Sequence, residues 1–178
     1  MKDYLLLNDN RGASLEGSPS IQIKKLKESL IKLFGRDLDS LRAEIEAYTD
    51  ESLLWKRAEG INNPSGNLVL HLVGNLNNYI GAILGNSGYI RNRPAEFSST
   101  TTKEDLLQKI QDTKKVVIRV IENLSAEDFQ EEYPEDVLSY PMTTEYFLIH
   151  LQGHLNYHLG QINYHRRLLS NSERFTQT

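Results

Sequence analysis

Apolar residues recur along this chain at spacings of three to five positions, a pattern typical of helices that bury one face. The first run follows Ser18-Pro19, where a capping residue precedes a residue suited to the first helical turn. It predicts one long helix over 20–48, in which Gly35 costs about 1 kcal/mol relative to Ala. Its apolar positions are Ile23, Leu26, Leu30, Leu33, Leu38, Leu41 and Ile45.

Two further apolar runs predict the second and third helices. The second helix spans 65–84, after the start signal Asn62-Asn63-Pro64-Ser65, and we expect Gly85 to end it. The third helix spans 102–123 and opens with Thr102-Lys103-Glu104-Asp105, which resembles a capping box.

The fourth predicted helix starts at Thr143 or Thr144 and runs to about Ser170. Because no stretch alternates apolar and polar residues long enough for a strand, we expect an all-α fold, a four-helix bundle with long crossover connections. We interpret 20–178 as a single domain and 1–19 as a flexible N-terminal arm. Three connections join the predicted helices: 49–63, 85–101 and 125–142. The first contains a short amphipathic turn at Leu53-Leu54-Trp55, and the third contains a short helical turn at 126–129.

The composition is that of a protein with a hydrophobic core. Of 178 residues, 39% are hydrophobic and 25% are charged, and no apolar run approaches the roughly 18–20 residues of a membrane span. The apolar stretch Tyr4 to Leu7 is too short for a signal peptide, so we expect a cytoplasmic protein without membrane association. The absence of cysteine excludes disulfides, thiolate ligands and a cysteine nucleophile. A net charge of −4 argues against nucleic-acid binding.

Four of the five histidines lie in the last predicted helix. Measured around the helix from His154, the others lie at about −40° (His150), +40° (His158) and +20° (His165). They therefore form one stripe, which borders the apolar face. His154 and His158 are one turn apart, the spacing at which two imidazoles on one helix bind the same metal ion.

Such a metal site needs a third ligand, and His71 is the candidate. It lies between Leu70 and Leu72 in the most apolar helix, where a core-facing position can meet the stripe on the last helix. Three neutral imidazoles leave coordination positions open, as catalytic metal sites do. Nitrogen ligands suit zinc, nickel, iron or copper, so the ligand type does not select the metal.

Other polar residues near these histidines have two interpretations each. Asn75 lies one turn after His71, and Gln161 belongs to the histidine stripe, so both are candidates to line the pocket or to orient a ligand imidazole. A structural hydrogen bond between helices is the alternative for both. His150 is a further pocket candidate, but for His150 and His165 we favour an exposed helix face that titrates.

A charged cluster lies in the connection between the second and third helices. Arg91, Arg93 and Glu96 are candidates to anchor an anionic substrate, such as a carboxylate on a thiol cofactor. We favour the alternative, in which salt bridges pin this long connection to the bundle.

Three segments, in order, resemble the DinB/YfiT-like superfamily. The last helix, His150-Leu-Gln-Gly-His154-Leu-Asn-Tyr-His158-Leu-Gly-Gln161-Ile, is similar to the family pattern HxxxHxGQI. The segment Asn67-Leu-Val-Leu-His71-Leu-Val-Gly-Asn75 resembles the family's single-histidine helix. The segment Gly88-Tyr-Ile-Arg91-Asn-Arg93-Pro-Ala-Glu96-Phe97 resembles the RxRxxEF loop of one uncharacterised branch. The resemblance covers about residues 20–170.

The resemblance implies a four-helix bundle, often a homodimer, that holds a divalent metal ion by three histidines, here His71, His154 and His158. The implied cofactor is zinc, nickel, iron or manganese. Characterised relatives include transferases that use low-molecular-weight thiols such as bacillithiol or mycothiol as co-substrates, and many others are labelled metal-dependent hydrolases.

Three hypotheses about function follow. The favoured one is a metal-dependent enzyme acting on a small molecule, either a thiol S-transferase or a hydrolase. The second is a metal-binding bundle without catalysis, acting as a sensor or stress-associated protein. The third is a metal-free structural or interaction bundle.

Overall fold

The computed structural model describes residues 19–176, with side chains from 21 to 170. The predicted N-terminal arm therefore lies outside the described residues, apart from Pro19, where the first helix begins. The elements are α1 (Pro19–Glu46), η2 (Glu51–Trp55), α2 (Ser65–Leu76), η3 (Asn77–Leu84), α3 (Arg93–Ser98), α4 (Lys103–Asn123), α5 (Ala126–Gln130) and α6 (Thr144–Thr176).

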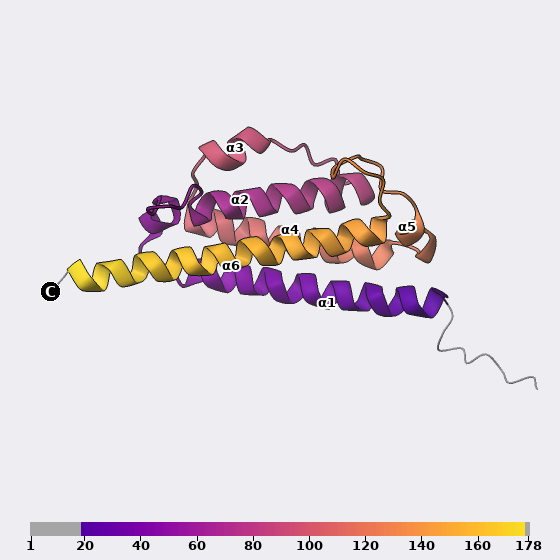
Figure 1. The fold of residues 1–178 in the computed structure, drawn as a ribbon, viewed down its shortest axis with the longest axis horizontal. Coiled ribbons are helices and arrows are strands. Elements are labelled where there is room, and N and C mark those ends of the chain that lie inside the picture. The colour runs from indigo at the N-terminus through magenta and orange to yellow at the C-terminus, as the bar shows by residue number, and fades with distance from the viewer. Residues whose placement is uncertain (1–18, 177–178) are drawn as a thin grey trace, which may run out of the picture.

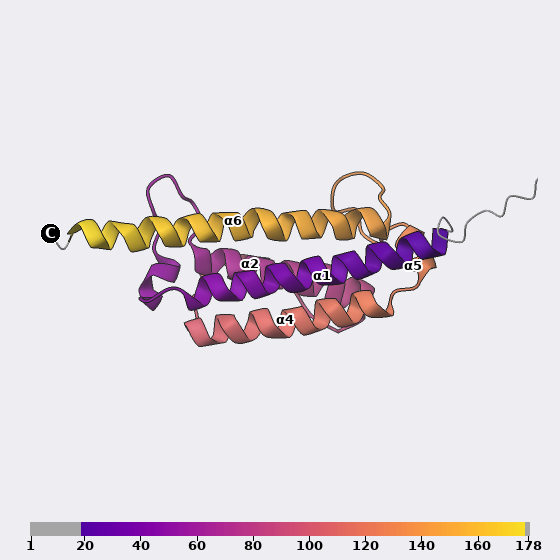
Figure 2. The ribbon, with the colours of Figure 1, turned by 90° about the horizontal axis from the view of Figure 1, so that it is seen from below.

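Four long helical segments form the bundle, which confirms the predicted fold class (Figure 1). α1 packs against α4 and α6, and α2 packs against the same two helices, so α1 and α2 lie diagonally across the bundle. α1 and α6 run in one direction, whereas α2 and α4 run in the other (Figures 1 and 2). The crossover 85–102 returns the chain along the whole bundle, because α2 and α4 are parallel.

The core consists of apolar side chains from all four long segments. Leu30, Leu38, Leu41 and Ile45 of the predicted first-helix pattern are buried in it. Leu53 and Leu54 of η2 also enter the core, as the predicted amphipathic turn requires. The largest side chains that are less than 2% exposed include Tyr48, Phe34, Phe129 and Phe147.

Buried and half-buried polar contacts fix α1 beside α6. Asp37 is 3% exposed and accepts hydrogen bonds from Gln152 and Asn156 of α6. Seven residues further along α1, Glu44 accepts from Asn163 and Arg166. Because the later residue of α1 bonds to the later residues of α6, the two helices are parallel, and the two sets of hydrogen bonds fix their axial register.

The second predicted helix has the expected bounds but contains two hydrogen-bonding patterns. α2 continues without a break into η3, a π-helix, in which an N–H donates five residues back; Gly85 N–H, for example, donates to Ile80 O at 3.0 Å. At the junction, Asn77 Nδ2 donates to Val73 O at 2.9 Å and to Thr113 Oγ1 of α4 at 2.7 Å. Apolar spacing alone does not distinguish this arrangement from a continuous α-helix.

Gly85 ends this helix, as predicted, but for a different physical reason. Its φ is −105°, so the backbone is not in the left-handed conformation that usually selects glycine at a helix end. A Cβ at this position would lie 2.3 Å from Val120 Cγ2 of α4. Close packing of the two helices therefore explains the glycine.

The connection 85–101 contains a short helix, α3, that the sequence analysis treated as irregular. Asn92 caps it, since its side chain accepts a hydrogen bond from Ala95 N, and Pro94 occupies the first turn. Six residues are too few to show the apolar period of an amphipathic helix. Figure 1 shows α3 on the outside of the bundle, against α2.

The other predicted ends agree with the structure within a few residues. Thr102 caps α4 by accepting from Asp105 N, and Ser125 forms a capping box with Asp128 at the start of α5. α6 begins at Thr144 and extends to Thr176, about two turns beyond the predicted end.

Among the described residues, no helix combines the length and apolarity needed to cross a membrane.

Candidate metal centre

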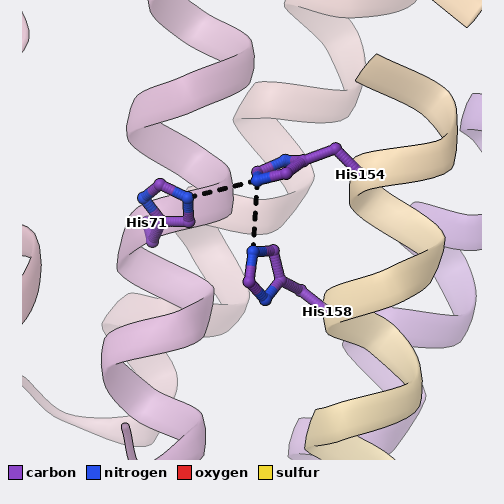
Figure 3. A group of neighbouring side chains, drawn as sticks. All are labelled: His71, His154 and His158. Atoms are coloured by element: carbon purple, nitrogen blue, oxygen red, sulfur yellow. Dashed lines mark hydrogen bonds between the residues drawn. The ribbon is translucent and has the colours of Figure 1, made fainter. Parts of the chain in front are cut away.

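Three histidines from two helices converge near the middle of the bundle (Figure 3). His71 comes from α2, and His154 and His158 come from successive turns of α6. His154 Nε2 lies 3.4 Å from His71 Nε2 and 3.1 Å from His158 Nε2. One nitrogen of each ring lies within 4.8 Å of the other two. Among the described residues, this is the group of histidine, aspartate and glutamate side chains close enough together to share a metal ion.

The antiparallel packing of α2 on α6 produces this convergence. His71 is 8% exposed, because α2 is buried on nearly every side, and it meets the line of α6 residues that borders the core. His154 and His158 are half-buried, so the cluster is covered by the bundle but reachable from solvent. Such partial access is what a site that exchanges small molecules requires.

The outer nitrogens of two of the rings have partners. His71 Nδ1 lies 2.9 Å from Glu96 Oε2, and His158 Nδ1 lies 2.7 Å from Gln161 Oε1. These contacts direct both Nε2 atoms toward the shared centre. Gln161 thus occupies the place that the sequence analysis suggested for it, beside a candidate ligand imidazole.

The other two pocket candidates lie differently. Asn75 is 7% exposed, and its Oδ1 is buried without a hydrogen-bond partner. His150 is exposed, its ring stacks on Phe147 at 5.8 Å, and its centroid lies 6.4 Å from that of His154. His150 therefore flanks the cluster from outside, as an exposed position on the helix face.

The chemistry of the cluster fits a divalent metal ion. Two imidazole nitrogens bound at about 2.0–2.1 Å to one tetrahedral ion are about 3.3–3.4 Å apart, close to the two distances observed here. His154 contacts both other rings through Nε2, while its Nδ1, on the side away from the cluster, is buried without a hydrogen-bond partner. The donor set of three imidazoles is one that zinc and other first-row metals accept.

The electrostatics of the cluster favour neutral rings. Burial, followed by the neighbouring His158 and His71, lowers the pKa of His154 to about 4. Burial also lowers the pKa of His71, although the hydrogen bond with Glu96 opposes this effect, and it lowers the pKa of His158. Because only the neutral imidazole binds a metal ion, these shifts keep the three rings ready to bind at neutral pH.

The salt bridge of the loop cluster lies within the crossover, and Glu96 ties the crossover to α2 through its contact with His71. Arg91 donates to Glu96 from Nε at 2.7 Å and from Nη2 at 3.0 Å. Arg93 instead lies over the ring of Phe97 at 5.8 Å. The sequence analysis placed Glu96 in this loop but missed its contact with His71; the RxRxxEF motif was the available signal.

His165 contradicts the predicted exposed, titrating face, since it is 1% exposed; it lies about two turns beyond His158 on α6. Its Nδ1 lies 2.9 Å from Ser65 Oγ and 2.8 Å from Tyr48 Oη, and its Nε2 lies 2.8 Å from Lys56 O. Since a carbonyl oxygen only accepts, Nε2 of His165 must donate to Lys56 O, and Nδ1 of the neutral ring therefore accepts a hydrogen bond from a hydroxyl group. The imidazole thus links α6 to the segment that follows α1, to the start of α2 and to the end of η2.

We expect the metal-free protein to lose stability as the pH falls below about 6.5. Burial lowers the pKa of His165 in the fold, opposed by its hydrogen bond to Lys56 O. The His165 side chain of the unfolded chain therefore takes up a proton near pH 6.5, whereas that of the folded chain does so only at lower pH. The contribution of His165 to the free energy of unfolding is thus fully present above about pH 6.5 and is lost as the pH falls below it. Urea unfolding at several values between pH 7.5 and 5 measures this pH dependence of the free energy of unfolding, which we expect to be shallower in His165→Leu. A free energy of unfolding that stays constant over this range in wild type would contradict the prediction.

Comparisons with known proteins match this chain in fold and over the residues that contain the histidine cluster. The sequence matches the family model of the DinB superfamily over residues 33–162, a range that includes all three clustered histidines. Its structure is similar to the crystal structure of a DinB-like protein from Bacillus cereus ATCC 10987, with a TM-score of 0.62 and 18% identity, covering 80% of this chain and 92% of that chain. No curated protein matches the sequence. The chain therefore belongs to the DinB superfamily.

Proposed function

We propose that His71, His154 and His158 hold a divalent metal ion, and that the protein is a metal-dependent enzyme acting on a small molecule. The observation that carries this proposal is the convergence of three Nε2 atoms at 3.1–3.4 Å from two helices. When bound, a divalent ion lowers the pKa of a coordinated water or thiol and so supplies a nucleophile at neutral pH.

The chain's own residues keep the three imidazoles neutral and directed at one point. Gln161 Oε1 accepts a hydrogen bond from His158 Nδ1, which leaves Nε2 of that ring unprotonated. Phe97 covers the ring of His71 at 5.2 Å between centroids, and Tyr157 packs beside His158 at 5.2 Å. These rings limit water on two sides of the cluster.

A cavity of about 330 Å³ borders Gln161, the hydrogen-bond partner of His158, although none of the three clustered histidines lines it. It is lined by Gln161 and Tyr164 of α6, by Leu68 of α2 and by the segment 60–63. Its volume suits a molecule of metabolite size. Gln161 joins this cavity to His158, since its side chain touches both.

Both reaction classes suggested by the resemblance are compatible with this chain. Because the protein has no cysteine, a sulfur nucleophile would come from a low-molecular-weight thiol as co-substrate. Hydrolysis of an ester or amide needs only water. The homodimer implied by the resemblance stays a prediction.

The experiment is elemental analysis of protein purified without a histidine tag, followed by turnover assays with and without metal. We expect about one zinc, nickel, iron or manganese ion per chain, and metal-dependent turnover of either thiol–electrophile pairs or ester and amide substrates. Protein that contains no metal and takes up none after stripping would contradict the metal site. Metal without turnover in either assay class would favour the non-catalytic alternative.

A further inference from the structure

The crossover helix α3 delivers one carboxylate to the back of the histidine cluster. Glu96 is the buried residue of α3, at 6% exposure, although it carries a charge. Asn67 of α2 fixes the position of this helix by donating to Glu96 O at 3.0 Å and to Ser99 O at 3.2 Å. The backbone at the glutamate and three residues after it is thus tied to α2, and the glutamate side chain is buried against that helix.

Arg91 fixes the carboxylate in a single orientation. Its guanidinium forms the two hydrogen bonds described above, one to each carboxylate oxygen. Such bidentate pairs are charge-assisted and geometrically specific. Burial acts to lower the pKa of the Arg91 guanidinium, but its hydrogen bonds with Glu96 and the charge of Glu96 outweigh burial and raise it, so Arg91 stays a cation beside the carboxylate.

The helix opposite provides space for this carboxylate. Gly74 lies three residues after His71 on α2, and a Cβ there would lie 2.1 Å from Glu96 Oε1. Glycine is unfavourable inside a helix, because it is the most flexible residue when unfolded. Its presence at this position is explained by the close approach of the carboxylate.

Both oxygens of Glu96 accept hydrogen bonds from Arg91, and this decides which ring nitrogen of His71 carries the hydrogen. With Glu96 Oε2 at 2.9 Å, His71 Nδ1 must carry the hydrogen. Arg91 Nη2 lies farther away, at 3.4 Å, and would be a partner only for the opposite tautomer, because a guanidinium only donates. The nearer and charged acceptor selects the Nδ1–H form.

We propose that Glu96 is a positioning residue, held by Arg91 in the space left by Gly74, which fixes His71 in the Nδ1–H tautomer with its Nε2 lone pair directed at His154 and His158. This inference rests on the proposed metal site. A carboxylate behind a ligand histidine also makes that imidazole a stronger electron donor, and loss of such a partner typically weakens metal binding about 10–100-fold.

The tautomer is tested first, in the metal-free full chain, so that the result does not depend on metal binding. Long-range proton–nitrogen NMR of uniformly ¹⁵N-labelled protein distinguishes the two ring nitrogens of His71, assigned with a His71→Asn variant. We expect a protonated Nδ1 and an unprotonated Nε2. A hydrogen on Nε2 would overturn the proposal, whether or not the protein binds metal.

Zinc affinity, measured against a chromophoric chelator, tests the consequence. We expect Glu96→Gln to bind zinc about 10–100-fold more weakly than wild type. The matched control is Asp37→Asn, which also neutralises a buried carboxylate; its α6 partners Gln152 and Asn156 point about 160° away from His154 around the helix, so affinity should not change.

Two outcomes separate failure of this inference from failure of the proposed function. Wild-type affinity in Glu96→Gln would overturn the positioning role while leaving the metal site intact. If wild type takes up neither zinc nor nickel, iron or manganese, the proposed function fails, and the NMR result alone decides the tautomer. Should Glu96→Gln not fold, Gly74→Ala replaces it: the added methyl group displaces the carboxylate, and unchanged zinc affinity in that variant would overturn the proposal.

Discussion

Replacing His154 by Ala is expected to lower zinc affinity by more than about a hundredfold. His154 is the shared neighbour of the other two histidines, at 3.4 Å from His71 and 3.1 Å from His158 between Nε2 atoms. Four-ligand zinc sites contribute about 10–16 kcal/mol, so one ligand is worth about 3 kcal/mol. Chelator competition and elemental analysis of the purified variant measure the loss.

The matched control for this variant is His150→Ala. His150 lies one turn earlier on the same helix, is exposed and stacks on Phe147, so its removal should leave zinc affinity within a few-fold of wild type. If both variants bind as wild type does, the three-histidine site is wrong. Equal losses of zinc affinity in both variants would mean that the metal site includes His150, one turn nearer the start of α6.

Replacing His165 by Leu is expected to destabilise the protein by about 2–5 kcal/mol. Leucine fills a similar volume but leaves the buried Ser65 Oγ without its acceptor, which costs about 1–3 kcal/mol. It also removes the hydrogen bond to Lys56 O, on an exposed residue, which contributes about 0.5–1.5 kcal/mol. For a chain of this length, that loss corresponds to a fall in Tm of roughly 5–15 °C.

Thermal and urea unfolding of the metal-free protein measure this effect, so that metal binding does not contribute. His150→Leu is the control, since an exposed substitution on the same helix should change stability by less than about 0.5 kcal/mol. Equal stability of His165→Leu and wild type would show that the buried network of Tyr48, Ser65 and His165 does not hold α6 to α2 and to the segment that follows α1.

The contrast between His154 and His165 explains how far sequence reasoning reaches. Both belong to one stripe of α6, and the sequence gives them nearly equal angles around the helix. His154 meets another histidine on α2, whereas His165 meets Ser65 and Tyr48, which no spacing along α6 could indicate. Position around one helix predicts which side faces the bundle, but the partner depends on the axial register of the opposing helix.

Glu96 shows a second limit. Its sequence neighbours suggested a salt bridge that pins the crossover to the bundle, and the observed pair with Arg91 lies within the crossover. Its contact with His71, 25 residues earlier, depends on how the crossover folds back over α2 and on the space at Gly74. Such a contact follows from three-dimensional packing and not from a periodic pattern.

The sequence by itself determined the all-α class, the four long helical segments and the pairing of His154 with His158, because these depend on local spacing along single helices. Tertiary structure alone decided that His71 reaches that pair, that Glu96 stands behind it and that His165 is buried. It also decided the π-helical turn after Leu76, where α2 packs on α4. The physical reason is the same in each case: helical period fixes angular position within one element, whereas the shift, direction and close approach of neighbouring elements depend on the whole packed core.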